Sequence, residues 1–183
     1  MLILASASPR RHELLAAAGI EHIVRAASVP EIRHPGESPQ AFVRRLAEAK
    51  ARAVTRAPGD IVLGADTVVA IEDEVFGKPD DEQDAARMLR RLSGKQHCVH
   101  TGICLLAERA AIVDMASTRV FFVKLTDEEI SEYTRSGESD DKAGAYAIQG
   151  LASKFISSIE GSYGNVVGLP VSLVYRHLKA LSA

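Results

Sequence analysis

The chain has 183 residues, of which 46% are hydrophobic, and a formal net charge of −2 at pH 7. This size supports one sizeable core, and because no Pro/Gly/Ser-rich linker interrupts the sequence, we expect a single domain spanning residues 1–183. The balanced charge argues against a protein that coats nucleic acid, and no apolar run approaches the roughly 20 residues needed to span a bilayer, so we expect no nucleic acid, no membrane and a cytoplasmic location.

The first predicted element is a short apolar strand over residues 2–5, followed by a helix that opens with two arginines. Ser8 suits the N-cap and Pro9 the first helical position, which puts Arg10 and Arg11 in the first turn, where the helix dipole disfavours cations. A bound phosphate would resolve this conflict, because helix N–H groups, serine hydroxyls and guanidinium groups all bind phosphate oxygens. A capped helix with solvated arginines is an equally good interpretation.

A second helix and a buried strand follow. Ser38-Pro39 repeats the cap-and-proline signal, and Pro58-Gly59 ends the helix. Lys50 lies on the apolar face of this helix, so it either extends to water or lines a pocket that needs a cation. The apolar run 61–65 is typical of a strand buried on both faces, and Asp66 follows it directly, at the end of a strand where α/β proteins bind ligands.

The rest of the chain continues to alternate between strands and helices. We expect Lys78 on a return loop not far from Asp66, and Cys98 and Cys104 as buried thiols rather than a disulfide or metal pair. His97 and His100 alternate with their neighbours along a strand and are interpreted as structural. In the middle of the chain we expect a strand over 68–71, a polar turn at 72–74, a helix ending at 93–94 and strands over 96–106 and 111–123. In the C-terminal part we expect a capping-box helix from Thr126, a surface or binding loop over 140–150, a strand over 155–159, a loop over 161–168 and a helix from Pro170.

Common phosphate-binding motifs are missing from the sequence. Neither Gly-x-x-x-x-Gly-Lys-Ser/Thr nor Gly-x-Gly-x-x-Gly occurs, and there is no Gly-x-Ser-x-Gly nucleophile elbow. What remains is a set of cations and carboxylates that suits metal-assisted phosphoryl chemistry. Its members are Arg10, Arg11, Lys50, Lys78, Glu31 and Asp66.

Five blocks, in this order, carry a resemblance that covers essentially the whole chain. They are Ser6-Ala7-Ser8-Pro9-Arg10-Arg11, Gly64-Ala65-Asp66-Thr67, Gly77-Lys78-Pro79, Asp141-Lys142-Ala143-Gly144-Ala145-Tyr146 with Gln149-Gly150, and Val167-Gly168-Leu169-Pro170. The chain resembles the Maf family of nucleoside triphosphate pyrophosphatases. The resemblance implies an α/β fold shared with the house-cleaning inosine triphosphate pyrophosphatases, with a long mixed sheet flanked by helices and a central cleft between two lobes.

The resemblance also implies a reaction and roles for particular residues. A nucleoside triphosphate would be hydrolysed to the monophosphate and pyrophosphate with Mg²⁺ or Mn²⁺. Asp66 would be the general base and a metal ligand, and Glu31 a metal ligand, although a solvated loop carboxylate is an alternative for Glu31. Ser6, Arg11, Lys50 and Lys78 would surround the triphosphate.

Three positions bear on the substrate. Arg10, Thr67 and Gln149 are similar to the branch that hydrolyses dTTP and UTP, whereas the 7-methyl-GTP branch has tryptophan, glutamine and glutamate there. A glutamine amide both donates and accepts hydrogen bonds, which suits the edge of uracil or thymine. A pyrophosphatase for 7-methyl-GTP and a non-catalytic nucleotide-binding regulator of cell division and septum formation are the alternatives, and the family implies a homodimer.

Overall fold

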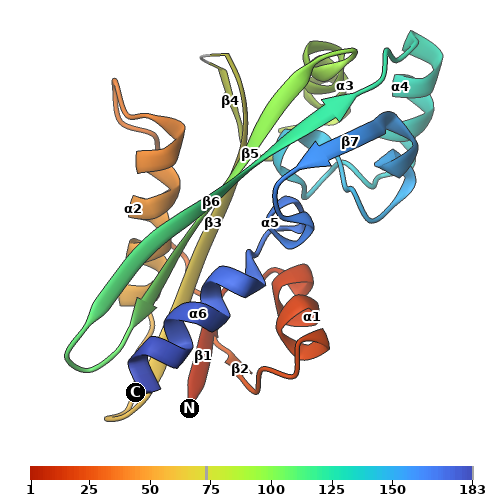
Figure 1. Cartoon of the computed structure of the whole chain (residues 1–183). Coiled ribbons are helices and arrows are strands. Elements are labelled where there is room, and N and C mark those ends of the chain that lie inside the picture. Colours follow the sequence, from red (N-terminus) through yellow and green to blue (C-terminus); the bar gives the residue numbers. More distant parts are fainter. Residues whose placement is uncertain (73, 183) are drawn as a thin grey trace. The chain divides into compact units, whose positions relative to one another are not determined.

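The chain is described by a computed structural model over residues 1–72 and 74–182. Within these residues, a 7-stranded open sheet has the order β2-β1-β3-β5-β6-β7, with β4 paired to β3 (Figure 1). Strand β1 is parallel to β2 and β3, whereas β4 and β7 are antiparallel to their neighbours. The expected α/β fold, a mixed sheet flanked by helices, is confirmed.

The elements have the following bounds. The strands are β1 (Leu2–Ala5), β2 (Ile23–Val24), β3 (Ile61–Ile71), β4 (Glu74–Phe76), β5 (Gln96–Leu106), β6 (Ala111–Phe122) and β7 (Ile156–Glu160). The helices are α1 (Pro9–Ala17), α2 (Pro39–Arg52), α3 (Glu82–Leu92), α4 (Asp127–Arg135), α5 (Tyr163–Val167) and α6 (Val171–Ser182), with short 3-10 helices η1 (Ala143–Ala145) and η2 (Leu151–Phe155).

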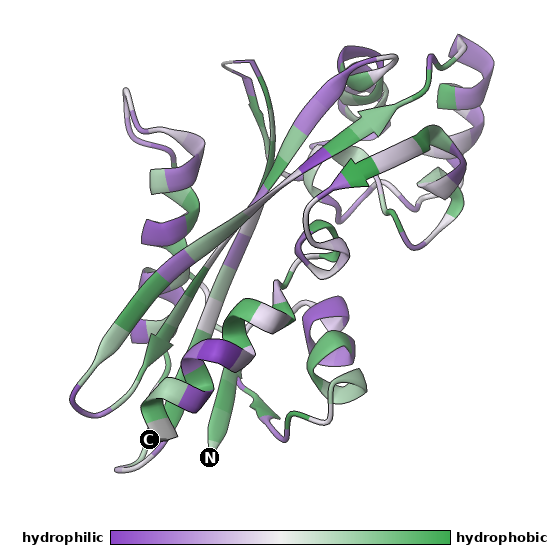
Figure 2. Ribbon diagram, viewed as in Figure 1, coloured by the Kyte–Doolittle hydropathy of each residue, from purple (hydrophilic) through white to green (hydrophobic). Residues whose placement is uncertain are grey.

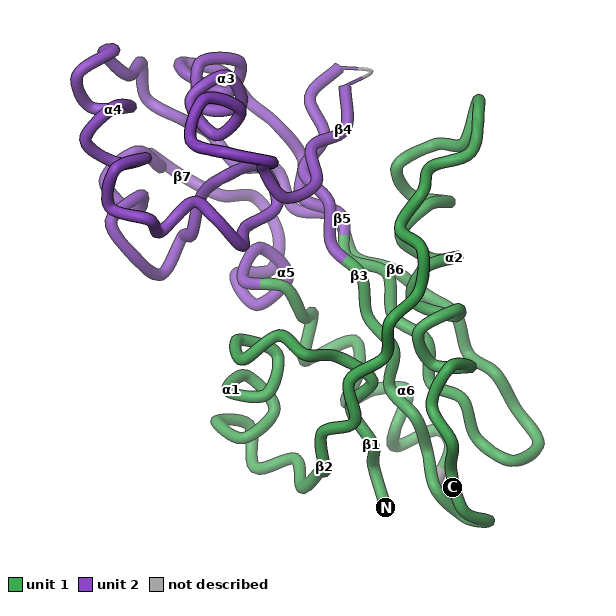
Figure 3. Tube along the Cα trace, turned by 180° about the vertical axis from the view of Figure 1, so that it is seen from behind, with its two compact units in different colours: residues 1–66, 101–116, 168–183 green, residues 67–100, 117–167 purple. Residues whose placement is uncertain are grey.

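The fold divides into two compact units, which Figure 3 shows in different colours. The first unit comprises Met1–Asp66, Thr101–Ala116 and Gly168–Ala183, and the second comprises Thr67–His100 and Ser117–Val167. Strands β3, β5 and β6 contribute residues to both units. The single domain and the cleft expected from the family stay predictions.

The first unit buries both faces of its part of the sheet. Leu2 and Leu4 of β1 lie in one apolar cluster with residues of α1 and α6, whereas Ile3 and Ala5 lie in another with residues of α2. Successive side chains of a strand point to opposite faces, so helices on both faces require a continuous apolar run. Figure 2 shows hydrophobic and hydrophilic residues alternating along α2 and α6, as expected for helices with one buried face.

Helix α2 lies directly against the backbone of the sheet. A Cβ atom added to Gly64 of β3 would lie 2.1 Å from the carbonyl oxygen of Ala47, and one added to Gly102 of β5 would lie 2.2 Å from that of Val43. Only glycine permits such contacts between backbones. These two glycines therefore set how closely α2 and its side chains approach the strands.

The second unit has its own apolar core. Residues of α3 and α4 pack with the second-unit parts of β3, β5 and β6 and with Phe155, which ends η2. His97 and Tyr146 lie among these residues, and their rings make edge-on contacts with Phe122. The loop around Tyr146 is therefore anchored in the core of this unit.

Most predicted elements are confirmed, and several predictions need correction. The segment 161–168, expected to be a loop, contains α5; helix α2 ends at Arg52, well before Pro58; and Phe155 belongs to η2 rather than to β7. The polar turn predicted at 72–74 includes Asp73, which lies outside the described residues, whereas Glu74 belongs to β4 and not to a turn. In the described part of the chain, no helix has the length and apolar character required to cross a bilayer.

Candidate active site

The first unit gathers polar side chains where β1 and β3 lie side by side. These strands are parallel and pair Ala5 with Gly64, so Ser6 follows β1 at the level where β3 continues into Ala65 and Asp66. Asp66 was expected to follow a strand, but β3 runs through it to Ile71 without a break. Ser6 and Asp66 are nevertheless both buried polar residues, with relative exposures of 6% and 5%.

Arg11 is fixed in place by β3, by Ser6 after β1 and by the loop before α6. Its Nε donates to the carbonyl oxygen of Gly168 at 2.8 Å, and its Nη1 donates to Ser6 Oγ at 2.9 Å and to the carbonyl oxygen of Ala65 at 3.0 Å. Burial lowers the pKa of this guanidinium, while the nearby Asp66 carboxylate opposes the shift. The alternative of two solvated arginines is therefore wrong for Arg11.

The start of α1 differs in one detail from the sequence prediction. Ser8 occupies the N-cap, but its side chain makes no capping hydrogen bond. Instead the backbone N–H of Ser8 donates to Ser6 Oγ at 3.2 Å, so one hydroxyl accepts from both Ser8 and Arg11. Arg10, which is half-buried, occupies the first turn as predicted.

Lys50 connects the two carboxylates named from the sequence. Its Nζ lies 2.6 Å from Oδ1 of Asp66 and 2.7 Å from Oε1 of Glu31. Lys50 reaches Asp66 because α2 packs against β3 at Gly64, so it lines a polar cluster instead of extending to water. Glu31 belongs to a loop, and its side chain is 56% exposed, so this pair of carboxylates has one buried and one solvated member.

The surroundings of Asp66 change its protonation equilibrium. Burial raises the pKa of this carboxyl above its usual value, although Lys50 and Arg11 oppose the shift. A raised pKa makes the ionised carboxylate a stronger base. We call Ser6, Arg11, Glu31, Lys50 and Asp66 the charge cluster.

Two members of the charge cluster could hold a divalent cation. The carboxylates of Glu31 and Asp66 converge on one nitrogen atom, and carboxylate oxygens are the ligands that Mg²⁺ and Mn²⁺ prefer. Over residues 1–72 and 74–182, no group of three or more His, Cys, Asp or Glu side chains is arranged to hold a metal ion. The chemistry of these two carboxylates suits a hard cation, which would need further ligands besides them.

The other predicted site residues belong to the second unit. Thr67 follows Asp66 in β3, Lys78 is exposed after β4, and Gln149 is exposed in a turn before η2. The loop of Lys78 is joined to the glycine-rich segment before Gln149, because Gly144 N–H donates to the carbonyl oxygen of Gly77 at 2.9 Å. That Lys78 lies near Asp66 stays a prediction.

Sequence reasoning missed the backbone partners of the site. The carbonyl groups of Ala65 and Gly168 hold Arg11, and backbone groups leave no residue-specific signal, although both residues fall within blocks of the family resemblance. Cys98 and Cys104 are free thiols, as predicted, but only Cys104 is fully buried. Both histidines of β5 are buried.

The fold and the charge cluster define an α/β protein with an open sheet, in which a buried carboxylate of the sheet lies near an arginine and a lysine of the flanking helices. A model of the Maf family, described as "Maf-like protein", matches residues 1–181. The chain belongs to the Maf family.

Curated relatives match the chain over almost its full length. The chain is 52% identical over 179 residues to a protein of Koribacter versatilis, covering 97% of this chain and 93% of the relative. It is 51% identical over 185 residues to one of Citrifermentans bemidjiense (100% and 96%) and 48% identical over 181 residues to one of Geobacillus sp. (98% and 97%). All three relatives are named dTTP/UTP pyrophosphatase.

Proposed function

We propose that this protein hydrolyses dTTP and UTP to the corresponding monophosphate and pyrophosphate. The observation that carries the proposal is the buried Asp66 carboxylate, whose pKa is raised and which is held by Lys50 beside Arg11. Membership of the Maf family and the names of its relatives support the same activity.

Asp66 serves as the general base in this proposal. Its carboxylate accepts a proton from a water molecule while the water oxygen forms a bond to the α-phosphorus. The bond from that phosphorus to the bridging oxygen breaks, and pyrophosphate leaves with the electron pair. Lys50 keeps the carboxylate oriented and, with Arg11, supplies positive charge for phosphate oxygens, which gain charge in the transition state.

A divalent cation, Mg²⁺ or Mn²⁺, is part of the proposal. Glu31 and Asp66 would hold it, and it would supply positive charge to the phosphate oxygens. Lys50, which contacts both carboxylates, keeps Asp66 oriented and contributes a flexible point charge for phosphate oxygens.

The remaining proposed contacts come from Lys78, Thr67 and Gln149 of the second unit and from Arg10 of α1 in the first unit. We assign Lys78 and Arg10 to the phosphates, and Thr67 and Gln149 to selection of the pyrimidine base, on the basis of the family's motif order. The amide of Gln149 can pair with both the carbonyl oxygen and the N–H of uracil or thymine. A cytoplasmic homodimer completes the proposal.

The experiment is a panel of dTTP, UTP, CTP, GTP and 7-methyl-GTP incubated with Mg²⁺, with monophosphate and pyrophosphate measured separately from diphosphate and phosphate. We expect release of pyrophosphate from dTTP and UTP well above that from GTP and 7-methyl-GTP. Equal rates for all nucleotides would contradict the substrate assignment, and preference for 7-methyl-GTP would favour the other branch. Tight binding without turnover would favour the regulatory alternative.

A further inference from the structure

Gln149, the residue proposed to select the base, lies in a tight turn. Gly150 N–H donates to the carbonyl oxygen of Ala147 at 3.2 Å, so Ile148 and Gln149 are the two central residues of a β-turn. Gln149 itself is exposed. A side chain at such a position selects a ligand only if its backbone is held still, because ordering a mobile loop on binding costs affinity.

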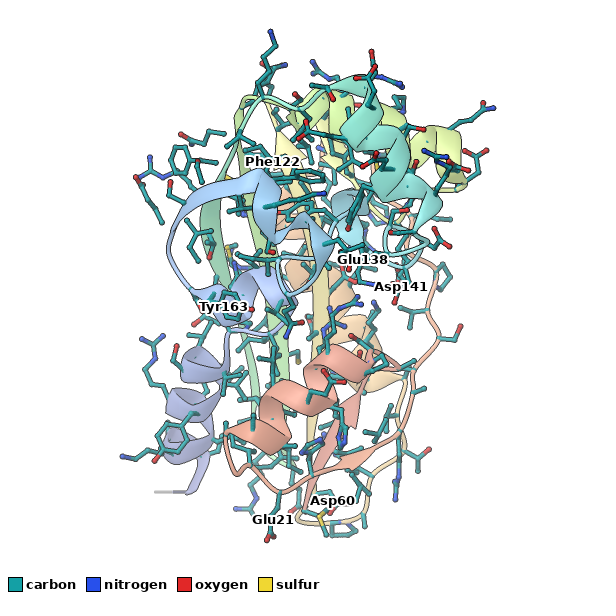
Figure 4. The ribbon with its side chains drawn as sticks, turned by 90° about the vertical axis from the view of Figure 1, so that its right-hand side faces the viewer. Glu21, Asp60, Phe122, Glu138, Asp141 and Tyr163 are labelled. Carbon is teal, nitrogen blue, oxygen red and sulfur yellow. The ribbon has the colours of Figure 1, made fainter. Side chains whose placement is uncertain are left out.

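Glu138 holds the chain on the C-terminal side of this turn. Its Oε2 accepts from Leu151 N–H at 3.0 Å, and its Oε1 accepts from Ala152 N–H at 3.4 Å. These are the first two N–H groups of η2, which have no partner within that helix. Glu138, labelled in Figure 4, is half-buried beside this segment.

Tyr133 of α4 holds the chain on the N-terminal side of the turn. Its hydroxyl oxygen accepts from Ala147 N–H at 3.2 Å, and its O–H donates to Glu138 Oε1 at 2.9 Å. The ring is only 2% exposed, and burial together with the bond to Glu138 raises the pKa of the phenol, so it stays a donor. One carboxylate and one phenol thus join both ends of the turn to α4 and the segment after it.

Gly150 provides an independent observation about the same contact. A Cβ atom added there would lie 2.0 Å from Glu138 Oε2 and 2.5 Å from its carboxyl carbon. The φ angle of Gly150 is −114°, so the glycine is not required by a left-handed backbone. What it permits is the close approach of the Glu138 carboxylate to the turn.

We propose that Glu138 and Tyr133 are positioning residues that clamp the Ala147–Gly150 turn at both ends and so fix the Gln149 amide for recognition of the pyrimidine base. This inference rests on the proposed function. We call Tyr133, Glu138 and the Ala147–Gly150 turn the turn clamp. It acts through the backbone, so neither residue needs to contact the nucleotide.

The test replaces Glu138 with Gln, which keeps the shape of the side chain but exchanges one acceptor oxygen for a donor that faces other donors. We expect faster hydrogen–deuterium exchange of the amides in 147–152 without nucleotide. We also expect KM for UTP to rise about fivefold to tenfold with kcat nearly unchanged, because a contact made equally in ground and transition states affects KM. Glu132→Gln, an exposed change in α4, is the matched control and should alter neither quantity.

Gly150→Ala is the second variant, because it leaves Glu138 in the chain but displaces its carboxylate. It should reproduce both effects of Glu138→Gln, and combining the two changes should add little. A merely structural role would lower kcat for all nucleotides in proportion to the folded fraction and leave KM unchanged.

The outcomes separate this inference from the proposed function. Unchanged exchange of 147–152 in both variants would overturn the clamp, and faster exchange with an unchanged KM for UTP would overturn its role in recognition. If the wild-type protein showed no preference for UTP over GTP, the proposed function and base recognition by Gln149 would both fail. The exchange rates would then still decide whether Glu138 holds the turn.

Discussion

Each of the two units contains a carboxylate at the centre of a polar network, and the two networks differ in what they give that carboxylate. In the charge cluster, Asp66 is 5% exposed and accepts from the ammonium of Lys50. In the turn clamp, Glu138 is half-buried and accepts from a phenol and two backbone N–H groups. One carboxylate faces a flexible cation, and the other faces fixed neutral donors.

This difference corresponds to the two tasks that we propose. A general base must change its protonation state, and burial that raises the pKa of Asp66 prepares it to accept a proton. A residue that only holds a backbone needs several short-range acceptor contacts and no change of charge. Chemistry and selection are therefore assigned to networks of different composition.

The largest expected effect is on the rate when Asp66 is changed to Asn. The amide keeps the volume and an acceptor for Lys50 but cannot take a proton from water, so we expect kcat for UTP to fall by about 10²- to 10⁴-fold. Binding of a non-hydrolysable UTP analogue, measured by calorimetry, should persist. Glu138→Gln, by contrast, should affect KM, so a large loss of kcat in that variant would contradict the division of tasks.

We expect acid to destabilise the fold through His97 of the second unit, because burial lowers the pKa of this residue from 6.5 to about 4. The unfolded chain takes up a proton here as pH falls through 6.5, and the folded chain does so only near 4. The contribution of neutral His97 to the stability of the fold is therefore complete above pH 6.5 and is lost as the pH falls from 6.5 to 4. We expect protonation at His97 to lower the free energy of unfolding by about 3 kcal/mol at pH 4.

Urea unfolding at pH 7 and pH 4 measures this loss, with His97→Gln as the non-titrating comparison. The variant should lose about 3 kcal/mol less than the wild type on acidification. The contribution of Asp66 to the free energy of unfolding depends on pH in the opposite direction. Its raised pKa favours the folded state in acid, and this contribution is lost as pH rises through the folded-state pKa. Equal acid sensitivity of both proteins would show that His97 is not the group responsible.

Arg11 stabilises the first unit, and its expected effect is on the free energy of unfolding. Arg11→Lys keeps the charge but removes the Nε donor to Gly168 and the fork that serves Ser6 and Ala65. We expect a loss of about 2 kcal/mol because buried acceptors are left unsatisfied. Arg44→Lys, an exposed change in α2, should shift the value by less than about 0.5 kcal/mol in the same urea titration.

The two networks were not equally accessible from sequence. Lys50 was found because a lysine on an apolar helix face conflicts with its surroundings, and Asp66 because it follows the apolar run 61–65. Their contact across sixteen residues could not be derived, since it depends on α2 packing against Gly64.

The turn clamp was not found at all from the sequence. Glu138 and Tyr133 serve backbone N–H groups, and any residue except proline offers the same donor, so no pattern of side chains marks their partners. Helix α5 was missed for a related reason, because its five residues include a glycine and two valines, which have low helix propensity.

The smallest expected effect, and the one that addresses selection alone, comes from Gln149→Glu. A carboxylate only accepts hydrogen bonds, so it suits the N–H donors on the edge of guanine and repels the carbonyl oxygen of uracil. We expect the ratio of kcat/KM for UTP to that for GTP to fall about tenfold, which corresponds to about 1.4 kcal/mol. Gln149→Ala should reduce UTP hydrolysis without the gain for GTP, since it removes the donor and adds no acceptor. Steady-state pyrophosphate release with both nucleotides measures these ratios. If the Gln149→Glu variant were as selective for UTP as the wild type, base recognition by this turn would be contradicted. The proposed role of Asp66 would not be affected by that result.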